Sequence, residues 1–241
     1  VDRVFFGIGV ETLSMTTSIN TPIAYQSYIG QYGTSTLNIP LTVGWARDAR
    51  DSALVPSRGT YQQANLEVGT AIGDLEYYRA YYQHQYFLPL FKGNVLSFNG
   101  EVGYGATYNG KEFPVTKNYY VGGIGSVRGY EPGTLGPRSA PNLYTGLTTP
   151  LGGASKLIGN VEYTFPIPGS GVDRTLRLFG FFDAGNAYAG SPTFSDLRTS
   201  YGFGLSWISP LGPLKFSYGI PLSKKPEDRL QRFQFQIGTA F

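Results

Sequence analysis

Alternation of side chains at every second position is the feature that most constrains this chain. In residues 200–207, Tyr201, Phe203, Leu205 and Trp207 alternate with Ser and Gly. A period of two belongs to a β-strand whose two faces meet different surroundings. We therefore predict an all-β fold of about ten antiparallel strands. The alternating segments are 3–11, 37–47, 63–68, 78–88, 96–104, 160–165, 176–183, 200–207, 214–220 and 232–241.

The apolar faces of these segments carry no charge. No Lys, Arg, Asp or Glu interrupts them, whereas the opposite faces carry Gly, Ser, Asn, Gln and scattered charged residues. A charge on the lipid side of a membrane strand costs about 2–4 kcal/mol at the bilayer midplane. Charged residues make up only 15% of the chain, against roughly 25% in soluble domains. We predict a portion of a transmembrane antiparallel β-barrel with a wet interior. A soluble β-sandwich would also alternate and is the alternative.

The connections between the segments differ in length. Short turns are expected at 91–94, 168–172 and 209–213, and long connections at 14–35 and 110–156. Outer-membrane barrels join their strands by short periplasmic turns and longer external loops. If the last strand ends at the periplasm, all three short turns lie on that side. We treat residues 1–241 as one barrel portion and 110–156 as a long external loop.

The long loop contains a basic residue in unusual surroundings. Arg128 lies among Gly and aromatic residues, which favour a loop that folds inward over one that extends into solvent. Loops of this length without secondary structure are uncommon in compact domains and are usually functional or disordered. Glu162 and Asp183 lie on the interior faces of the next two predicted strands, and a carboxylate binds a guanidinium directionally. We predict that these two residues anchor a segment made of Val127, Arg128, Gly129 and Tyr130.

Several chemistries are disfavoured by composition. The net charge is +3 with no basic stripe, so nucleic acid is not an expected partner. Cysteine is absent and His84 is the only histidine, which leaves little from which to build a metal site or a catalytic triad. Gly123, Gly125 and Gly129 have the wrong spacing for a dinucleotide fingerprint, and no βαβ unit surrounds them. We expect no metal, no cofactor and no enzymatic activity.

At this point the residues resemble a known family. Residues 127–130, Val-Arg-Gly-Tyr, resemble the motif in the sixth external loop of the BamA-type outer-membrane assembly and translocation barrels. Residues 209–222 and 233–241 resemble the last two strands of those barrels, and 51–59 resembles one of their periplasmic turns. The resemblance covers essentially the whole chain. It implies that the ten segments correspond to the seventh through sixteenth strands of a sixteen-stranded barrel, that is, to the C-terminal part of a longer protein.

The resemblance also implies a function and a location. Members of this family lie in the bacterial outer membrane and insert β-barrel proteins through a lateral seam of the barrel. The alternative is a related two-partner-secretion or translocation pore that passes polypeptides across the membrane. The implied partners are unfolded β-barrel precursors, outer-membrane lipid, and periplasmic accessory lipoproteins bound through POTRA domains that precede the barrel. Whether ten strands close on their own is left open by the sequence.

The same resemblance assigns roles to two groups of residues. In the family, the arginine that corresponds to Arg128 contacts acidic residues at the positions of Glu162 and Asp183. The last strand acts as a C-terminal signal during recognition of barrel precursors and as one side of the seam. The residues expected to carry that second role are Phe233, Phe235, Ile237, Gly238 and Phe241.

Overall fold

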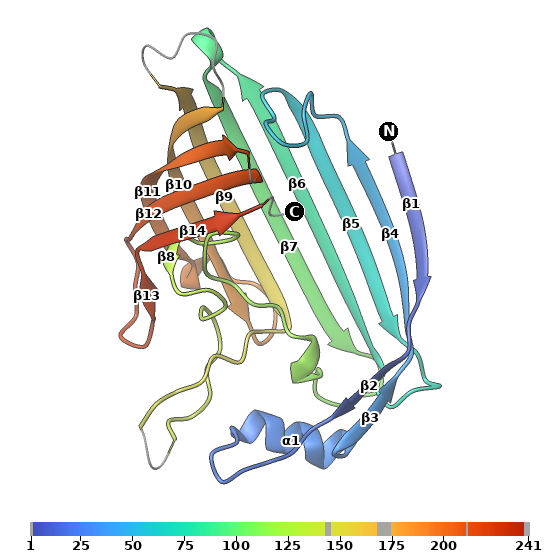
Figure 1. Ribbon diagram of the computed structural model, residues 1–241. Helices are drawn as coiled ribbons and strands as arrows, with labels where there is room; N and C mark the ends of the chain where they lie inside the picture. The colour runs from blue at the N-terminus through green and yellow to red at the C-terminus, as the bar shows by residue number, and fades with distance from the viewer. Residues whose placement is uncertain (1, 143–145, 168–174, 211, 239–241) are drawn as a thin grey trace.

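The computed structural model describes residues 2–142, 146–167, 175–210 and 212–238, and within them ten strands form one antiparallel sheet (Figure 1). This architecture confirms the predicted all-β barrel portion. Each predicted segment contributes one strand to this sheet. In spatial order the strands are β1 (Asp2–Ile8), β4 (Pro40–Asp48), β5 (Gly59–Gly69), β6 (Tyr77–Pro89), β7 (Val95–Thr107), β9 (Ser155–Pro166), β10 (Leu176–Tyr188), β11 (Arg198–Ser209), β12 (Gly212–Pro221) and β14 (Phe233–Ile237).

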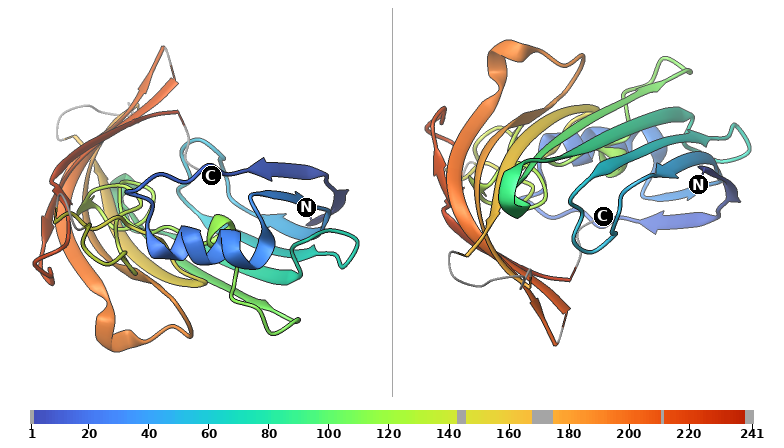
Figure 2. Two further views of the ribbon diagram at one scale, coloured as in Figure 1. Left: turned by 90° about the horizontal axis from the view of Figure 1, so that it is seen from below. Right: turned by 90° about the horizontal axis from the view of Figure 1, so that it is seen from above.

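The sheet curves strongly but does not close. β1 and β14 are its two edges, and the described residues contain no pairing between them. Figure 2 shows the two edge strands apart and the long loop within the curve of the sheet. The ten strands therefore form an open wall around an interior, which answers the question that the sequence left open.

Strand register places the predicted apolar positions on one face. Phe182 of β10 lies opposite Tyr201 of β11, and Tyr201 lies opposite Ile220 of β12. Phe235 of β14 is 62% exposed and Phe203 of β11 is 63% exposed, on this same outer face. The interior face of β10, in contrast, is buried beneath the loop. An uncharged apolar outer face is the surface that a membrane strand presents to lipid.

The two ends of the sheet are unlike. We call the end that carries the connections 108–154, 189–197 and 222–232 the loop end. The opposite end, the turn end, carries the connection 49–58 and the short turn at η1 (Phe91–Gly93). Two of the three predicted short turns thus lie at the same end, since β11 and β12 are also joined there. The third, predicted at 168–172, lies outside the described residues.

Smaller elements cover the loop end. β2 (Glu11–Ser14) pairs with β3 (Ser35–Asn38), β8 (Gly129–Tyr130) pairs with β13 (Leu230–Gln231), and η3 (Phe194–Asp196) follows β10. The segments 3–11 and 37–47, each predicted as one strand, are therefore divided between the main sheet and the β2–β3 pair. The division falls beside Pro40, whose nitrogen has no hydrogen to donate to a ladder.

The alternation gave no sign of helix α1 (Ile23–Tyr32), which lies in the predicted long connection 14–35. Pro22 precedes its first turn, and Gly33, with φ of 89°, ends it. Tyr28 and Tyr32 pack against Leu75 and Tyr77 in a buried cluster at the loop end. A helix this short gains most of its stability from such packing. Among the described residues, no helix is long and apolar enough to cross a membrane.

Candidate functional site

Arg128 is buried between two interior carboxylates. Its side chain is 4% exposed, and Asp183 is fully buried. Nε and Nη2 of Arg128 donate to Oδ2 and Oδ1 of Asp183, each at 2.7 Å. Nη1 donates to Oε2 of Glu162 at 2.5 Å, and the backbone nitrogen of Arg128 donates to Asp183 at 3.0 Å. The structure therefore places the three residues singled out in the sequence in direct contact.

A second set of residues surrounds these three. Lys215 of β12 donates to both oxygens of Glu162, at 3.0 and 2.9 Å. Asn160 donates to Oδ1 of Asp183 at 2.8 Å and to the carbonyl of Ser126 at 2.6 Å. The guanidinium carbon of Arg128 also lies 3.6 Å from the ring centre of Phe181. Two cations and two carboxylates therefore balance in charge.

The charge of Arg128 is favoured by its partners. Burial lowers the pKa of Arg128, but hydrogen bonds and attraction from Asp183 and Glu162 outweigh burial and hold that pKa above its ordinary value. Both carboxylates come from neighbouring strands of a rigid sheet, so the site is a fixed receptor for a cation supplied by the loop. This arrangement can hold a segment in place, and it contains no nucleophile with a neighbouring base.

Gly129 permits the loop to approach the sheet. It adopts φ of 91°, and a Cβ there would lie 3.1 Å from the backbone carbonyl carbon of Gly219 in β12. A Cβ on Gly219 would in turn lie 2.6 Å from the nitrogen of Gly129. The two glycines therefore allow backbone to pack on backbone, where a larger residue at either position would force the loop away.

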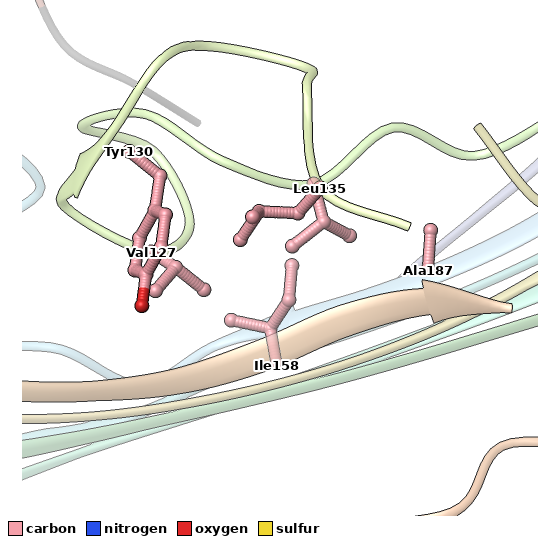
Figure 3. Close-up of a cluster of buried hydrophobic side chains, with 6 residues drawn as sticks. Val127, Tyr130, Leu135, Ile158 and Ala187 are labelled. Atoms are coloured by element: carbon pink, nitrogen blue, oxygen red, sulfur yellow. The ribbon is translucent and has the colours of Figure 1, made fainter. Parts of the chain in front are cut away.

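Val127 and Tyr130 fix the loop through apolar packing. They belong to a fully buried cluster whose other members come from the loop, from β9 and from β10 (Figure 3). The Tyr130 hydroxyl donates to the carbonyls of Ser223 and Thr199, at 2.6 and 3.2 Å. The cluster consists of Val121, Val127, Tyr130, Leu135, Ile158 and Ala187.

Further ion pairs hold the loop at other places. Lys117, in the 3-10 turn η2 (Val115–Lys117), contacts Glu11 at 2.8 Å and Glu67 at 3.1 Å. Another ion pair joins two strands of the wall, since Lys156 of β9 contacts Glu101 of β7 at 2.6 Å. No sequence pattern predicts these pairs, because Lys117 and Glu11, for example, are 106 residues apart. The only available signal was that the charges lie on interior faces.

The residues assigned to the last strand lie at the edge of the sheet. Phe233, Phe235 and Ile237 are exposed on the outer face of β14. Gly238 follows with φ of 89°, and its nitrogen donates to the carbonyl of Pro213 at 2.7 Å. Phe241 lies outside the described residues.

The interior between the wall and the loop is polar. A cavity of about 640 Å³ is lined by Arg128, Glu162, Lys215, Gln83 and Asn99, among others. Among the described residues, no group of three or more His, Asp and Glu is placed to bind a metal. In this cavity the charged side chains of Glu162 and Lys215 meet Arg128 of the loop.

Comparison with known proteins gives the family. Residues 3–241 match the Omp85 superfamily domain, which is nearly the whole chain. The chain belongs to the Omp85 superfamily. It is 40% identical over 275 residues to the outer membrane protein assembly factor BamA of Neisseria meningitidis serogroup B, covering 100% of this chain and 34% of that protein. It is also 32% identical to BamA of Nitratidesulfovibrio vulgaris, covering 83% of this chain and 25% of that protein.

The structure gives an independent likeness. This Omp85 chain matches the crystal structure of BamA from Haemophilus ducreyi lacking POTRA domains 1–3, with a TM-score of 0.82. The match covers 97% of this chain and 53% of that one at 20% identity, so it speaks for the fold alone. The chain spans about a third or less of the length of the two BamA relatives. It is a part of an outer-membrane β-barrel.

Proposed function

We propose that this chain is the part of an outer-membrane barrel that assembles other β-barrel proteins and inserts them into the membrane. The observation that carries the proposal is the 40% identity, over the whole chain, to a protein named an outer membrane protein assembly factor. The alternative, a two-partner-secretion or translocation pore, is not favoured, because both BamA relatives carry the assembly name. The proposed substrates are unfolded β-barrel precursors, and the proposed accessory partners are periplasmic lipoproteins bound outside this chain.

The position of β14 at the end of the sheet supports a physical route for insertion. β14 pairs with β12 on one side, and its other side is where the family resemblance puts the lateral seam, so opening of that seam would present unpaired N–H and C=O groups. Such an edge is a template for adding a strand. A precursor strand that pairs with the edge satisfies its backbone groups before it meets lipid, where an unsatisfied group costs several kcal/mol. No covalent chemistry or cofactor is required.

The anchored loop is fixed to the strands of the wall. Arg128, held by Asp183 and Glu162, joins the loop to β9 and β10, which lie at the centre of the described wall. Removal of one member of a buried ion pair typically costs about 3–5 kcal/mol, so the anchor holds the loop firmly in the interior. We assign Val127, Arg128, Gly129, Tyr130, Glu162 and Asp183 a positioning role and no catalytic one.

The test uses the full-length protein in liposomes. The folding rate of a urea-unfolded barrel precursor is compared between these liposomes and empty ones. The proposal predicts faster folding with the protein present. A demonstrably folded protein that gives no acceleration, but passes a polypeptide into the liposome, would replace the proposal with the secretion alternative.

A further inference from the structure

The last strand has a shorter ladder with its neighbour than the strand before it. Among the described residues, β14 pairs with β12 over five residue pairs, whereas β12 pairs with β11 over ten. The outward side chains of β14 are exposed, and the ring of Phe233 stacks on Phe216 of β12 at 6.5 Å between ring centres. A further contact that holds this edge strand lies on its interior face.

Gln234 is the best buried residue of β14. It is 4% exposed, and its Nε2 donates to the carbonyl oxygen of Tyr130 at 2.7 Å. The two residues are 104 positions apart in the chain. A side chain of the edge strand thus donates directly to the backbone of the loop motif, two residues after Arg128, which the carboxylates bind.

The chain just before β14 is tied to the same motif. Leu230 and Gln231 of β13 lie opposite Tyr130 and Gly129 of β8, and the nitrogen of Glu131 donates to the carbonyl of Arg229 at 2.9 Å. These contacts extend from the hydrogen bond of Gln234 toward the loop end. The loop motif and the entry to β14 therefore form one hydrogen-bonded ladder.

A buried ion pair holds the connection 222–232, which contains one strand of this ladder. Arg198, at the start of β11, donates to Asp228 in the 222–232 connection at 2.6 Å, and both side chains are almost fully buried. The backbone nitrogen of Lys225 donates to the same carboxylate at 2.7 Å. The connection is thereby held in the shape that presents β13 to the loop, and all of these contacts lie at the loop end.

We propose that Gln234 is a positioning residue that clamps the loop end of β14 to residues 127–130. The clamp holds the loop end of β14 more firmly than its turn end, and it makes the position of the long loop control how far the edge of β14 can move. This inference rests on the proposed function, since it concerns the edge at which a precursor strand would pair. According to this inference, β14 and residues 127–130 of the loop move together because Gln234 connects them.

The test is hydrogen exchange of the full-length protein in lipid nanodiscs, with no precursor present. Overlapping peptides report residues 233–235, 236–238 and 128–131 separately. Gln234→Leu removes the donor, and Gln236→Leu is the matched control on the same face of β14. Gln236 makes no side-chain hydrogen bond to the residues that the structure describes. If Gln234→Leu does not fold, Gln234→Asn, with its amide one methylene shorter, takes its place.

If the clamp exists, hydrogen exchange should change together in β14 and in the loop motif, and not elsewhere in the sheet. Gln234→Leu should accelerate exchange roughly tenfold both in 233–235 and in 128–131, as loss of a buried hydrogen bond of about 1.4 kcal/mol implies. Arg128→Lys, which loosens the loop, should likewise accelerate exchange in 233–235. Equal acceleration in β10 and β11 would indicate general destabilisation and overturn the inference. A change in β14 without a change in the loop would also overturn it.

The function is tested separately in the liposome assay. If the wild-type protein accelerates precursor folding while the exchange results contradict the clamp, only this inference fails. If the exchange results follow the prediction but the wild-type protein does not accelerate folding, the clamp stands and the proposed function fails.

Discussion

Replacement of Arg128 by Met is the sharpest perturbation of the anchor, because it removes the guanidinium and keeps an apolar side chain of similar length. Asp183 then retains only Asn160 and one backbone N–H of the loop, while Glu162 retains both contacts with Lys215. Asp183 would be a fully buried carboxylate with no cation in contact. We expect the free energy of unfolding to fall by about 3–5 kcal/mol.

The two carboxylates should respond differently in double-mutant cycles. Asp183→Asn removes the charge that Arg128→Met leaves unpaired, so the double variant should recover much of the loss. We expect a coupling energy between Arg128 and Asp183 of about 2–3 kcal/mol, at the upper end for contacting residues. The coupling between Arg128 and Glu162 should be smaller, because Glu162 keeps both contacts with Lys215 when Arg128 is replaced and is not left without a cation.

The assay is reversible urea unfolding of the full-length protein in detergent, followed by the gel mobility of the folded barrel. Limited proteolysis of residues 110–156 reports release of the loop in the same variants. If the coupling energy between Arg128 and Glu162 equals or exceeds that between Arg128 and Asp183, the reasoning is refuted. The burial of each carboxylate and the partners it keeps would then not determine the loss of stability. An unchanged midpoint and unchanged protease resistance in Arg128→Met would refute the anchor itself.

Three further predictions concern the loop and the turn end. Gly129→Ala should lower the free energy of unfolding by about 1–3 kcal/mol, because Gly129 has a positive φ and its Cβ would press on β12. Gly125→Ala is the control, since a Cβ there meets open space, and it should change the free energy of unfolding by less than about 0.5 kcal/mol. Lys117→Met leaves the carboxylates of Glu11 and Glu67 without this cation. The α1 region should then become sensitive to protease, while the β-strands of the wall stay resistant. Burial opposes ionisation of Asp51, yet hydrogen bonds from Ser57 and neighbouring backbone lower the pKa of Asp51 to about 2. A carboxyl with a lowered folded pKa stabilises above its unfolded pKa of about 3.9, and this contribution is lost as pH falls toward 2. Amide exchange at Ser57, corrected for intrinsic rate, should therefore rise over this window in the wild type and stay constant in Asp51→Asn.

The wall of the barrel could be predicted from the sequence because its signal is local. An uninterrupted apolar face, as in Tyr201, Phe203 and Trp207, needs no knowledge of the neighbouring strand. The contact of Arg128 with Glu162 and Asp183 could be anticipated for a related reason. Both carboxylates occupy interior positions of strands that follow the loop, where a buried charge requires a partner.

The parts that escaped prediction depend on contacts between distant residues. Helix α1 is held by packing of Tyr28 and Tyr32 on residues more than 40 positions away, and its own pattern is weak. The pairing of β8 with β13 spans two residues in each strand and joins segments about 100 residues apart. Such short, long-range pairings leave no periodicity, so only the folded structure discloses them.

The proposed insertion route requires a precursor strand to pair with the edge of β14 that faces away from β12. The most direct measurement places a photo-crosslinking residue at position 235 of β14, or at position 203 of β11, in the full-length protein during assembly of a barrel precursor. Phe235 and Phe203 are equally exposed on the outer face, so they make a matched pair. We predict crosslinks to the precursor from position 235 and none from position 203. Crosslinks of equal yield from both positions, or none from 235 while the precursor folds, would contradict the claim.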